Sequence, residues 1–218
     1  ELSGRSGPWL QLNCAAIPEA LAESSLFGHA NGAVTGANTN QPGYFIDADG
    51  GTLFIDEIGD LDAKLQPKLL NALDHRQATP VGGTRPIPFD TRLVTATRKE
   101  LNSEVTEGRF RADLYARLAT VVISMPPLRD RIEDMLVVLL DRLGGEPKLS
   151  ADLVDALLQY HWPYNFREVE SIAIELSVKG AGYDELVVEL IEERLQSADQ
   201  RPARSMASHQ PPPQRPGS

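Results

Sequence analysis

The chain has 218 residues, of which 41% are hydrophobic, and this length suits one large domain or two small ones with a true apolar core. Its formal net charge of −10 argues against a domain that binds nucleic acid through overall positive charge, but it does not exclude a local basic patch. The single cysteine, Cys14, cannot form an internal disulfide, and no apolar run approaches the roughly 20 residues that span a bilayer, so we expect a cytoplasmic protein.

Strands and helices are predicted to alternate through the first part of the chain. Residues 28–43, rich in glycine and asparagine, and residues 82–88, with glycine and proline, are predicted to form loops or hairpin tips. The expected regular elements are, in chain order, strand 9–13, helix 18–26, strand 53–56, helix 63–74, strand 92–97, helix 108–118 and strand 121–125. This alternation is typical of an α/β fold with a parallel sheet.

The next part of the chain is predicted to be helical throughout. Apolar residues recur at helical spacing between 132 and 143 and indicate an amphipathic helix. Ser150 is placed to cap the following helix, and Asn165 with Glu168 three residues later is predicted to form a capping box. From residue 197 proline, serine, arginine and glutamine dominate, so we expect a disordered tail without a DNA-binding helix-turn-helix.

Two adjacent acids, Asp56 and Glu57, follow directly on the apolar run 53–55. An unbroken apolar run indicates a strand buried on both faces of a parallel sheet, and ligands bind at the carboxyl ends of such strands. This is the layout of a Walker B element, in which one acid holds magnesium and its neighbour polarises the attacking water. The alternative is a strand that ends in a solvated acidic turn.

Three arginines are candidates for binding phosphate. Arg111 and Arg117 lie six residues apart on a predicted helix and do not share one narrow face, which suits contact with a neighbouring subunit. The alternative is a solvated helix face on which Arg111 pairs with Asp113. Arg167 lies in the first turn of its predicted helix, where the dipole disfavours a cation unless an anion binds there. The alternative for Arg167 is pairing with the acids that follow it.

Five segments together resemble, in order and spacing, the AAA+ domain of bacterial sigma-54-dependent transcription activators, also called enhancer-binding proteins. The resemblance covers roughly residues 1–180. The matching segments are Leu12–Ala16, Glu23–His29 with Gly32–Ala37, the acid-bearing segment 50–61, Gly108–Leu118 and Trp162–Glu168.

The resemblance implies an AAA+ P-loop NTPase-type parallel sheet followed by a small α-helical lid, with ATP and Mg²⁺ as ligands. Asp56 would hold magnesium and Glu57 would orient the attacking water. Asn13 would lie beside Glu57 as a hydrogen-bond switch that holds this base away until a partner engages. From the residues alone, the favoured interpretation of Asn13 is an asparagine at a strand end that satisfies local backbone groups.

The same resemblance implies assembly into a ring, expected to be a hexamer. Arg111 and Arg117 would reach the γ-phosphate held by the adjacent subunit, and Arg167 would contact nucleotide phosphate. A surface loop would contact the sigma-54 RNA polymerase holoenzyme when ATP is bound, so that hydrolysis remodels the promoter complex. This loop consists of Gly32, Ala33, Val34, Thr35, Gly36 and Ala37.

The chain also departs from the family pattern. No Walker A motif occurs in it, so we expect a fragment that lacks the first strand and the P-loop and hydrolyses little or no ATP alone. Val34 replaces the phenylalanine of the contact loop, Arg98 stands where the family has asparagine, and Tyr164 replaces a glycine. Two alternatives therefore stay open, a degenerate binding module that does not hydrolyse ATP and a different AAA+ ATPase, although the contact loop speaks against the latter.

The expected domains are a partial AAA+ core at 1–127, a helical lid at 128–196 and the tail at 197–218.

Overall fold

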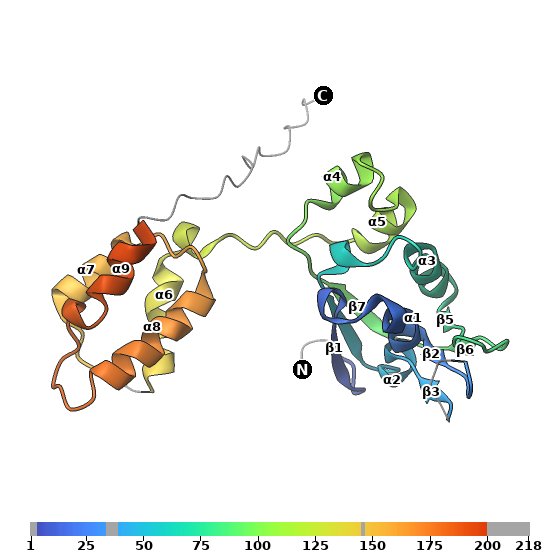
Figure 1. The fold of residues 1–218 in the computed structure, drawn as a ribbon, viewed down its shortest axis with the longest axis horizontal. Coiled ribbons are helices and arrows are strands. Elements are labelled where there is room, and N and C mark those ends of the chain that lie inside the picture. The colour runs from blue at the N-terminus through green and yellow to red at the C-terminus, as the bar shows by residue number, and fades with distance from the viewer. Residues whose placement is uncertain (1–3, 34–38, 145–146, 200–218) are drawn as a thin grey trace. The chain divides into compact units, whose positions relative to one another are not determined.

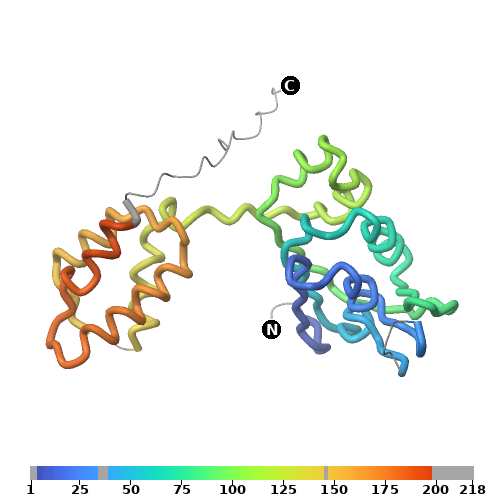
Figure 2. The backbone as a smooth tube through the Cα atoms, viewed as in Figure 1, coloured from blue at the N-terminus to red at the C-terminus, as the bar shows by residue number. Residues whose placement is uncertain are grey.

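The structure is a computed structural model that describes residues 4–33, 39–144 and 147–199. It divides into two compact units, residues 1–123 and 124–218, which are treated separately below. Figure 1 shows the first unit as sheet and helices and the second as helices alone, and Figure 2 traces the same backbone. Val34, Thr35, Gly36 and Ala37 of the predicted contact loop lie outside the described residues.

The first unit alternates strands and helices as predicted. Its strands are β1 (Trp9–Asn13), β2 (Gly28–His29), β3 (Gln41–Pro42), β4 (Thr52–Asp56), β5 (Gln77–Ala78), β6 (Ile87–Pro88) and β7 (Arg92–Thr95). Its α-helices are α1 (Glu19–Phe27), α2 (Tyr44–Asp47), α3 (Gln66–His75), α4 (Leu101–Thr106) and α5 (Ala112–Leu118), and the 3-10 turns η1 (Cys14–Ala16) and η2 (Ile58–Asp60) follow β1 and β4.

The central sheet is parallel, as the sequence predicts. Its strand order is β1-β4-β7, so β4 lies in the middle with a parallel neighbour on each side. Asn13 at the end of β1 is in register with Asp56 at the end of β4. The carboxyl ends of the strands therefore gather the polar residues at one edge.

The two faces of β4 differ in burial. Leu53 and Ile55 are fully buried and pack into a core with Leu69 of α3 and Leu114 of α5. On the other face Phe54 is half-buried and stacks on Trp9, whose residue surface remains 63% exposed. The apolar run is thus buried on one face and only partly covered on the other within the described residues.

Of two elements predicted near the end of this unit, one begins later than expected and the other does not form. The helix expected over 108–118 begins only at Ala112, because Gly108 adopts a positive φ of 74° that ends the preceding turn. The strand expected over 121–125 does not form, and Val121, Val122, Ile123 and Met125 are all at least 71% exposed. A β-prone run becomes a strand only when a neighbour pairs with it, and no described strand does so here.

Two small hairpins lie side by side at one end of the unit (Figure 1). Strands β2 and β3 form the first and enclose the contact loop, and β5 and β6 form the second. The amide of Val81 donates to the carbonyl of Gly28 at 2.8 Å, and the amide of Ala30 donates to the carbonyl of Val81 at 2.9 Å. Gly28 permits this arrangement because its φ is 85° and a Cβ there would come within 2.6 Å of the Gln41 carbonyl oxygen.

The second unit is a small helical bundle with its own core. It contains η3 (Leu128–Asp130), α6 (Glu133–Leu143), α7 (Ala151–Gln159), α8 (Phe166–Lys179), η4 (Val188–Leu190) and α9 (Glu192–Asp199). Its core is formed by buried residues of α6, α7 and α8 and of the segments that flank them, among them Met135, Leu139, Leu153, Leu157, Trp162, Val169, Ile172 and Leu176. No helix in the described ranges is both long and apolar enough to cross a bilayer.

Of the two predicted caps in this unit, one is confirmed and one is wrong. The hydroxyl oxygen of Ser150 accepts from the amide of Leu153 at 3.2 Å, as expected. Asn165 does precede α8, but its side-chain oxygen accepts from the amide of Leu128 at 2.7 Å instead of capping its own helix. Glu168 accepts from the Tyr160 hydroxyl at 2.7 Å and the Tyr164 amide at 3.2 Å.

Candidate nucleotide-hydrolysis site

The acid pair lies at the carboxyl end of the central strand β4. Asp56 is the last residue of this strand, and Glu57 adopts a left-handed conformation with φ 52° and ψ 45°. The Glu57 amide donates to Asp56 Oδ1 at 3.0 Å, and Asp56 is half-buried. The left-handed conformation of Glu57 ends the extended strand at Asp56.

Asn13 contacts Asp56 rather than Glu57. Its Nδ2 donates to Asp56 Oδ2 at 3.2 Å, and its Oδ1 accepts from the Ala15 amide at 2.9 Å. This pairing follows from the strand register, which places Asn13 directly opposite Asp56. The side chain thus satisfies a local backbone donor and orients the first acid of the pair.

Glu57 is instead held by Arg98, in the loop that follows β7. Arg98 Nε lies 2.5 Å from Glu57 Oε1, and the Arg98 amide donates to Glu57 Oε2 at 3.3 Å. Only 14% of the Glu57 side chain is exposed, against 84% of Arg98. The sequence marks Arg98 as unusual but does not show which acid it meets.

The next lysine, Lys99, ties the same two loops together. Its Nζ lies 2.7 Å from Asp60 Oδ1 and donates to the Gly59 carbonyl at 2.9 Å. The Ile58 amide donates to the Ala96 carbonyl at 3.0 Å. The loop after β7 and the turn after β4 are therefore joined by contacts of backbone and side chains.

Arg111 and Arg117 are both half-exposed and paired with acids of their own unit. Arg111 immediately precedes α5 and lies 2.6 Å from Asp113 Oδ2, as the solvated alternative predicts. This hydrogen bond raises the pKa of Arg111 and lowers that of Asp113. Arg117 lies 3.2 Å from Asp74 Oδ1. In the described residues, neither arginine forms a hydrogen bond or ion pair with Asp56 or Glu57.

Gln66 is a residue of this region that the sequence does not reveal. It is buried, with 1% exposure, and its Nε2 donates to the carbonyls of Leu61 at 3.2 Å and Arg109 at 3.0 Å. Its Oε1 accepts from the Arg111 amide at 2.9 Å. One side chain therefore joins the segment after the acid pair to the start of the arginine-bearing helix α5.

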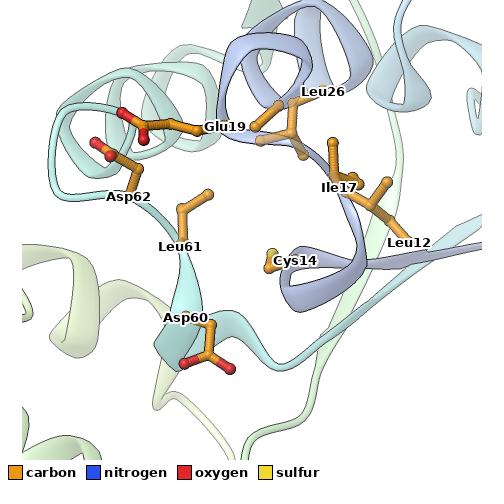
Figure 3. A pocket seen from close by; sticks show the side chains of 9 residues that line it. Leu12, Cys14, Ile17, Glu19, Leu26, Asp60, Leu61 and Asp62 are labelled. Carbon is orange, nitrogen blue, oxygen red and sulfur yellow. The ribbon is translucent and has the colours of Figure 1, made fainter.

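A cavity of about 180 Å³ lies between η1, α1 and the segment 60–62, and neither Asp56 nor Glu57 is among its lining residues. Leu12, Cys14, Leu26 and Leu61 line it, and the Cys14 sulfur projects towards it in Figure 3. Burial, reinforced by the nearby charges of Asp60 and Asp56, raises the pKa of Cys14 to about 11. This thiol is consequently neutral and unreactive near pH 7.

Arg167 belongs to the second unit, in the first turn of α8. It is exposed, and no hydrogen bond or ion pair joins its side chain to another described residue. The acids that follow it in the sequence bind elsewhere, since Glu168 is bound to Tyr160 and Glu170 lies 2.8 Å from Arg142. The intramolecular pairing considered as an alternative is therefore absent from the described structure.

Of the contact loop, the structure describes only Gly32 and Ala33. The loop is closed at its base, where the Asn31 amide donates to Asn40 Oδ1 at 2.7 Å. Ala33 lies against Gly82 of the second hairpin, because a Cβ on Gly82 would come within 2.5 Å of the Ala33 Cβ. A displacement of one hairpin would therefore press directly on the other.

The donor set fits magnesium bound together with a nucleotide. Mg²⁺ usually takes one or two carboxylates and completes its shell with water and substrate phosphates. Asp56 offers a carboxylate at the sheet edge, and among the described residues no group of three or more His, Cys, Asp or Glu could hold a metal by itself. The residues present thus suit a shared ion and do not form a cage made of protein ligands alone.

Comparison with known proteins identifies the family. Residues 2–124 match the family described as the Sigma-54 interaction domain, and the chain belongs to this family. It is 48% identical over 169 residues to the anaerobic nitric oxide reductase transcription regulator NorR of Vibrio vulnificus (strain YJ016), covering 74% of this chain and 33% of NorR. It is 46% identical over 180 residues to the DNA-binding transcriptional regulator NtrC of Bradyrhizobium sp. (strain RP501 Parasponia), covering 79% and 38%.

The fold is likewise that of solved members of this class. The crystal structure of NtrX from Brucella abortus in complex with ATP superposes with a TM-score of 0.75 at 28% identity, covering 92% of this chain and 49% of NtrX. The predicted resemblance and the AAA+ fold class are thus confirmed. The chain spans only about a third to two fifths of the length of NorR and NtrC.

Proposed function

We propose that this chain is part of a transcription activator that couples ATP hydrolysis to remodelling of the sigma-54 RNA polymerase holoenzyme. One observation carries the proposal: Asp56 and Glu57 stand at the carboxyl end of the central strand, inside the segment that matches the Sigma-54 interaction domain. The similarity to NtrX, whose structure was solved with ATP, supports ATP as the nucleotide. A cytoplasmic location follows from this function.

In this proposal the two acids have different tasks. Asp56, oriented by Asn13, holds the magnesium that comes with the nucleotide. The ion neutralises charge on the phosphates when it is bound. Glu57 orients the attacking water and accepts its proton on a carboxylate oxygen.

The remaining candidates act at surfaces of the two units. Arg111 and Arg117, both about half-exposed, would exchange their acidic partners for the phosphates of a neighbouring subunit in a hexameric ring. Arg167, exposed at the start of an α-helix of 14 residues, would bind nucleotide phosphate. The contact loop from Gly32 to Ala37 would bind sigma-54.

A second function has an observation in its favour. The 2.5 Å contact between Arg98 and Glu57 occupies the carboxylate that hydrolysis requires. A degenerate member of the family could retain binding to sigma-54 or to sister subunits without turning over ATP.

The test compares ATP turnover and retention on immobilised sigma-54 in the intact protein that carries this chain. Glu57→Gln should lower turnover by about 10²–10⁴-fold, the usual contribution of a general base, while ATP-dependent binding to sigma-54 persists. Glu185→Gln, at an exposed position outside the site, serves as the control and should change neither quantity. Binding without turnover in the unmodified protein would favour the degenerate module, and loss of both would refute the proposal.

A further inference from the structure

The contact between Arg98 and Glu57 is asymmetric in burial. The carboxylate is 86% shielded from solvent, since 14% of the Glu57 side chain is exposed, whereas the arginine side chain is 84% exposed. Both carboxylate oxygens accept from the same residue, one from the guanidinium Nε and the other from the backbone amide. A hydrogen bond between charged groups is about twice as strong as a neutral one. The candidate base is therefore turned towards the loop after β7.

This loop does not depend on Arg98 for its position. Lys99 fixes it to Asp60 and to the Gly59 carbonyl, and the backbone bond between Ile58 and Ala96 joins it to the turn after β4. The amide of Lys99 also donates to Thr97 Oγ1 at 3.1 Å. Removal of the Arg98 side chain should leave the loop in place and release Glu57 Oε1, while the weaker bond from the Arg98 amide to Oε2 remains.

We propose that Arg98 is a positioning residue that latches Glu57 and thereby limits ATP hydrolysis. The inference rests on the proposed function, because it assigns regulation to the same acid pair. Glu57 must give up its bond to the guanidinium before it can accept a proton from water beside Asp56. The contact from Asn13 to Asp56 leaves Glu57 without a hydrogen bond from that side, so in this chain the latch comes from β7 rather than from β1.

The structural part of the test is nuclear magnetic resonance of the arginine Nε–H groups in this chain. The Nε–H proton of Arg98 should exchange with water about two- to fivefold more slowly than that of Arg92, the protection expected of an ion pair with one exposed partner. Arg92 is a suitable control because it is exposed and no side-chain bond joins it to another described residue. Glu57→Ala, which removes both acceptor oxygens, should bring the Arg98 rate to that of Arg92. Equal rates in the unmodified chain would overturn the latch.

The functional part uses the intact protein and steady-state ATP hydrolysis. Arg98→Asn should raise kcat about two- to fivefold with KM unchanged, because it releases the base without altering nucleotide binding. Arg92→Gln should change neither constant, and adding Glu57→Gln to Arg98→Asn should abolish the gain. A fall or no change in kcat for Arg98→Asn would overturn the latch while the proposed function stands. Absence of hydrolysis in every variant would overturn both.

Discussion

Substitution of Gln66 by methionine tests whether one buried amide holds helix α5 in place. Methionine has a similar length and no hydrogen-bonding amide, so the shape of the site is largely kept. The change removes two donated bonds, to the carbonyls of Leu61 and Arg109, and one accepted bond, from the Arg111 amide. We expect α5 and the segment 61–66 to open more readily as a result.

The magnitude follows from the groups that lose their partner. A buried backbone group left unsatisfied costs about 1–3 kcal/mol. Three groups are affected, but Arg109 and Arg111 are exposed residues, so water can replace part of what is lost. We therefore expect a loss of about 2–4 kcal/mol in the free energy of opening, less than the sum of three separate penalties.

Native-state hydrogen exchange read by mass spectrometry measures this quantity on peptides from α3 and α5. A loss of that size makes exchange about 30- to 1,000-fold faster, since about 1.4 kcal/mol corresponds to a factor of ten. Gln77→Met is the matched control, because Gln77 is exposed in β5 of the same unit and should shift stability by less than about 0.5 kcal/mol. Similar exchange in the two variants would refute the role assigned to Gln66.

Two further predictions concern other groups. Because folding raises the pKa of Cys14 from 9.0 to about 11, thiolate at pH 8 is about a hundredfold scarcer in the folded chain, and iodoacetamide should alkylate it correspondingly more slowly than the unfolded chain. Because the pKa is higher in the folded chain, the thiol stabilises the fold fully below pH 9, and this stabilisation is lost as the pH rises towards 11. An alkylation rate of the folded chain that levels off near pH 9 would contradict the raised pKa. Asn165→Ala should destabilise the second unit by about 2–4 kcal/mol, because alanine must hold a φ of 53° and leaves the Leu128 amide without its acceptor. Asn165→Gly should reduce the free energy of unfolding by less, because glycine tolerates the positive φ although the bond to the Leu128 amide is still lost. Urea unfolding followed by Trp162 fluorescence in a Trp9→Phe background measures both variants. Equal losses would contradict a separate contribution from backbone strain.

The parts of the fold that the sequence predicts are those fixed by local pattern. Strands β1, β4 and β7 fall within one or two residues of the predicted ranges, because each contains a short group of apolar residues that favours a strand. The failed strand at 121–125 has the same pattern. Strand formation also needs a paired neighbour, and this condition is not written in the segment itself.

The position of the acid pair at a strand end was predictable, but the contacts of the two acids were not. Sequence placed Asp56 and Glu57 at the end of a strand, and the register explains why Asn13 meets Asp56. The partner of Glu57 depends on the path of the loop after β7, which no local pattern specifies. Gln66 carries no signal at all, since a glutamine in the first turn of a helix is ordinarily solvated.

These contacts converge on the short segment between Glu57 and Leu61. From one side Arg98 and Lys99 hold Glu57, Gly59 and Asp60. From the other side Gln66 holds the Leu61 carbonyl and, through the Arg111 amide, the start of α5. The segment is short and bonded at both ends, so the Glu57 side chain can turn away from Arg98 while the backbone of the segment stays in place. This arrangement supports a latch made by the Arg98 side chain, because the bonds from Lys99 and Gln66 hold the segment when that side chain is removed.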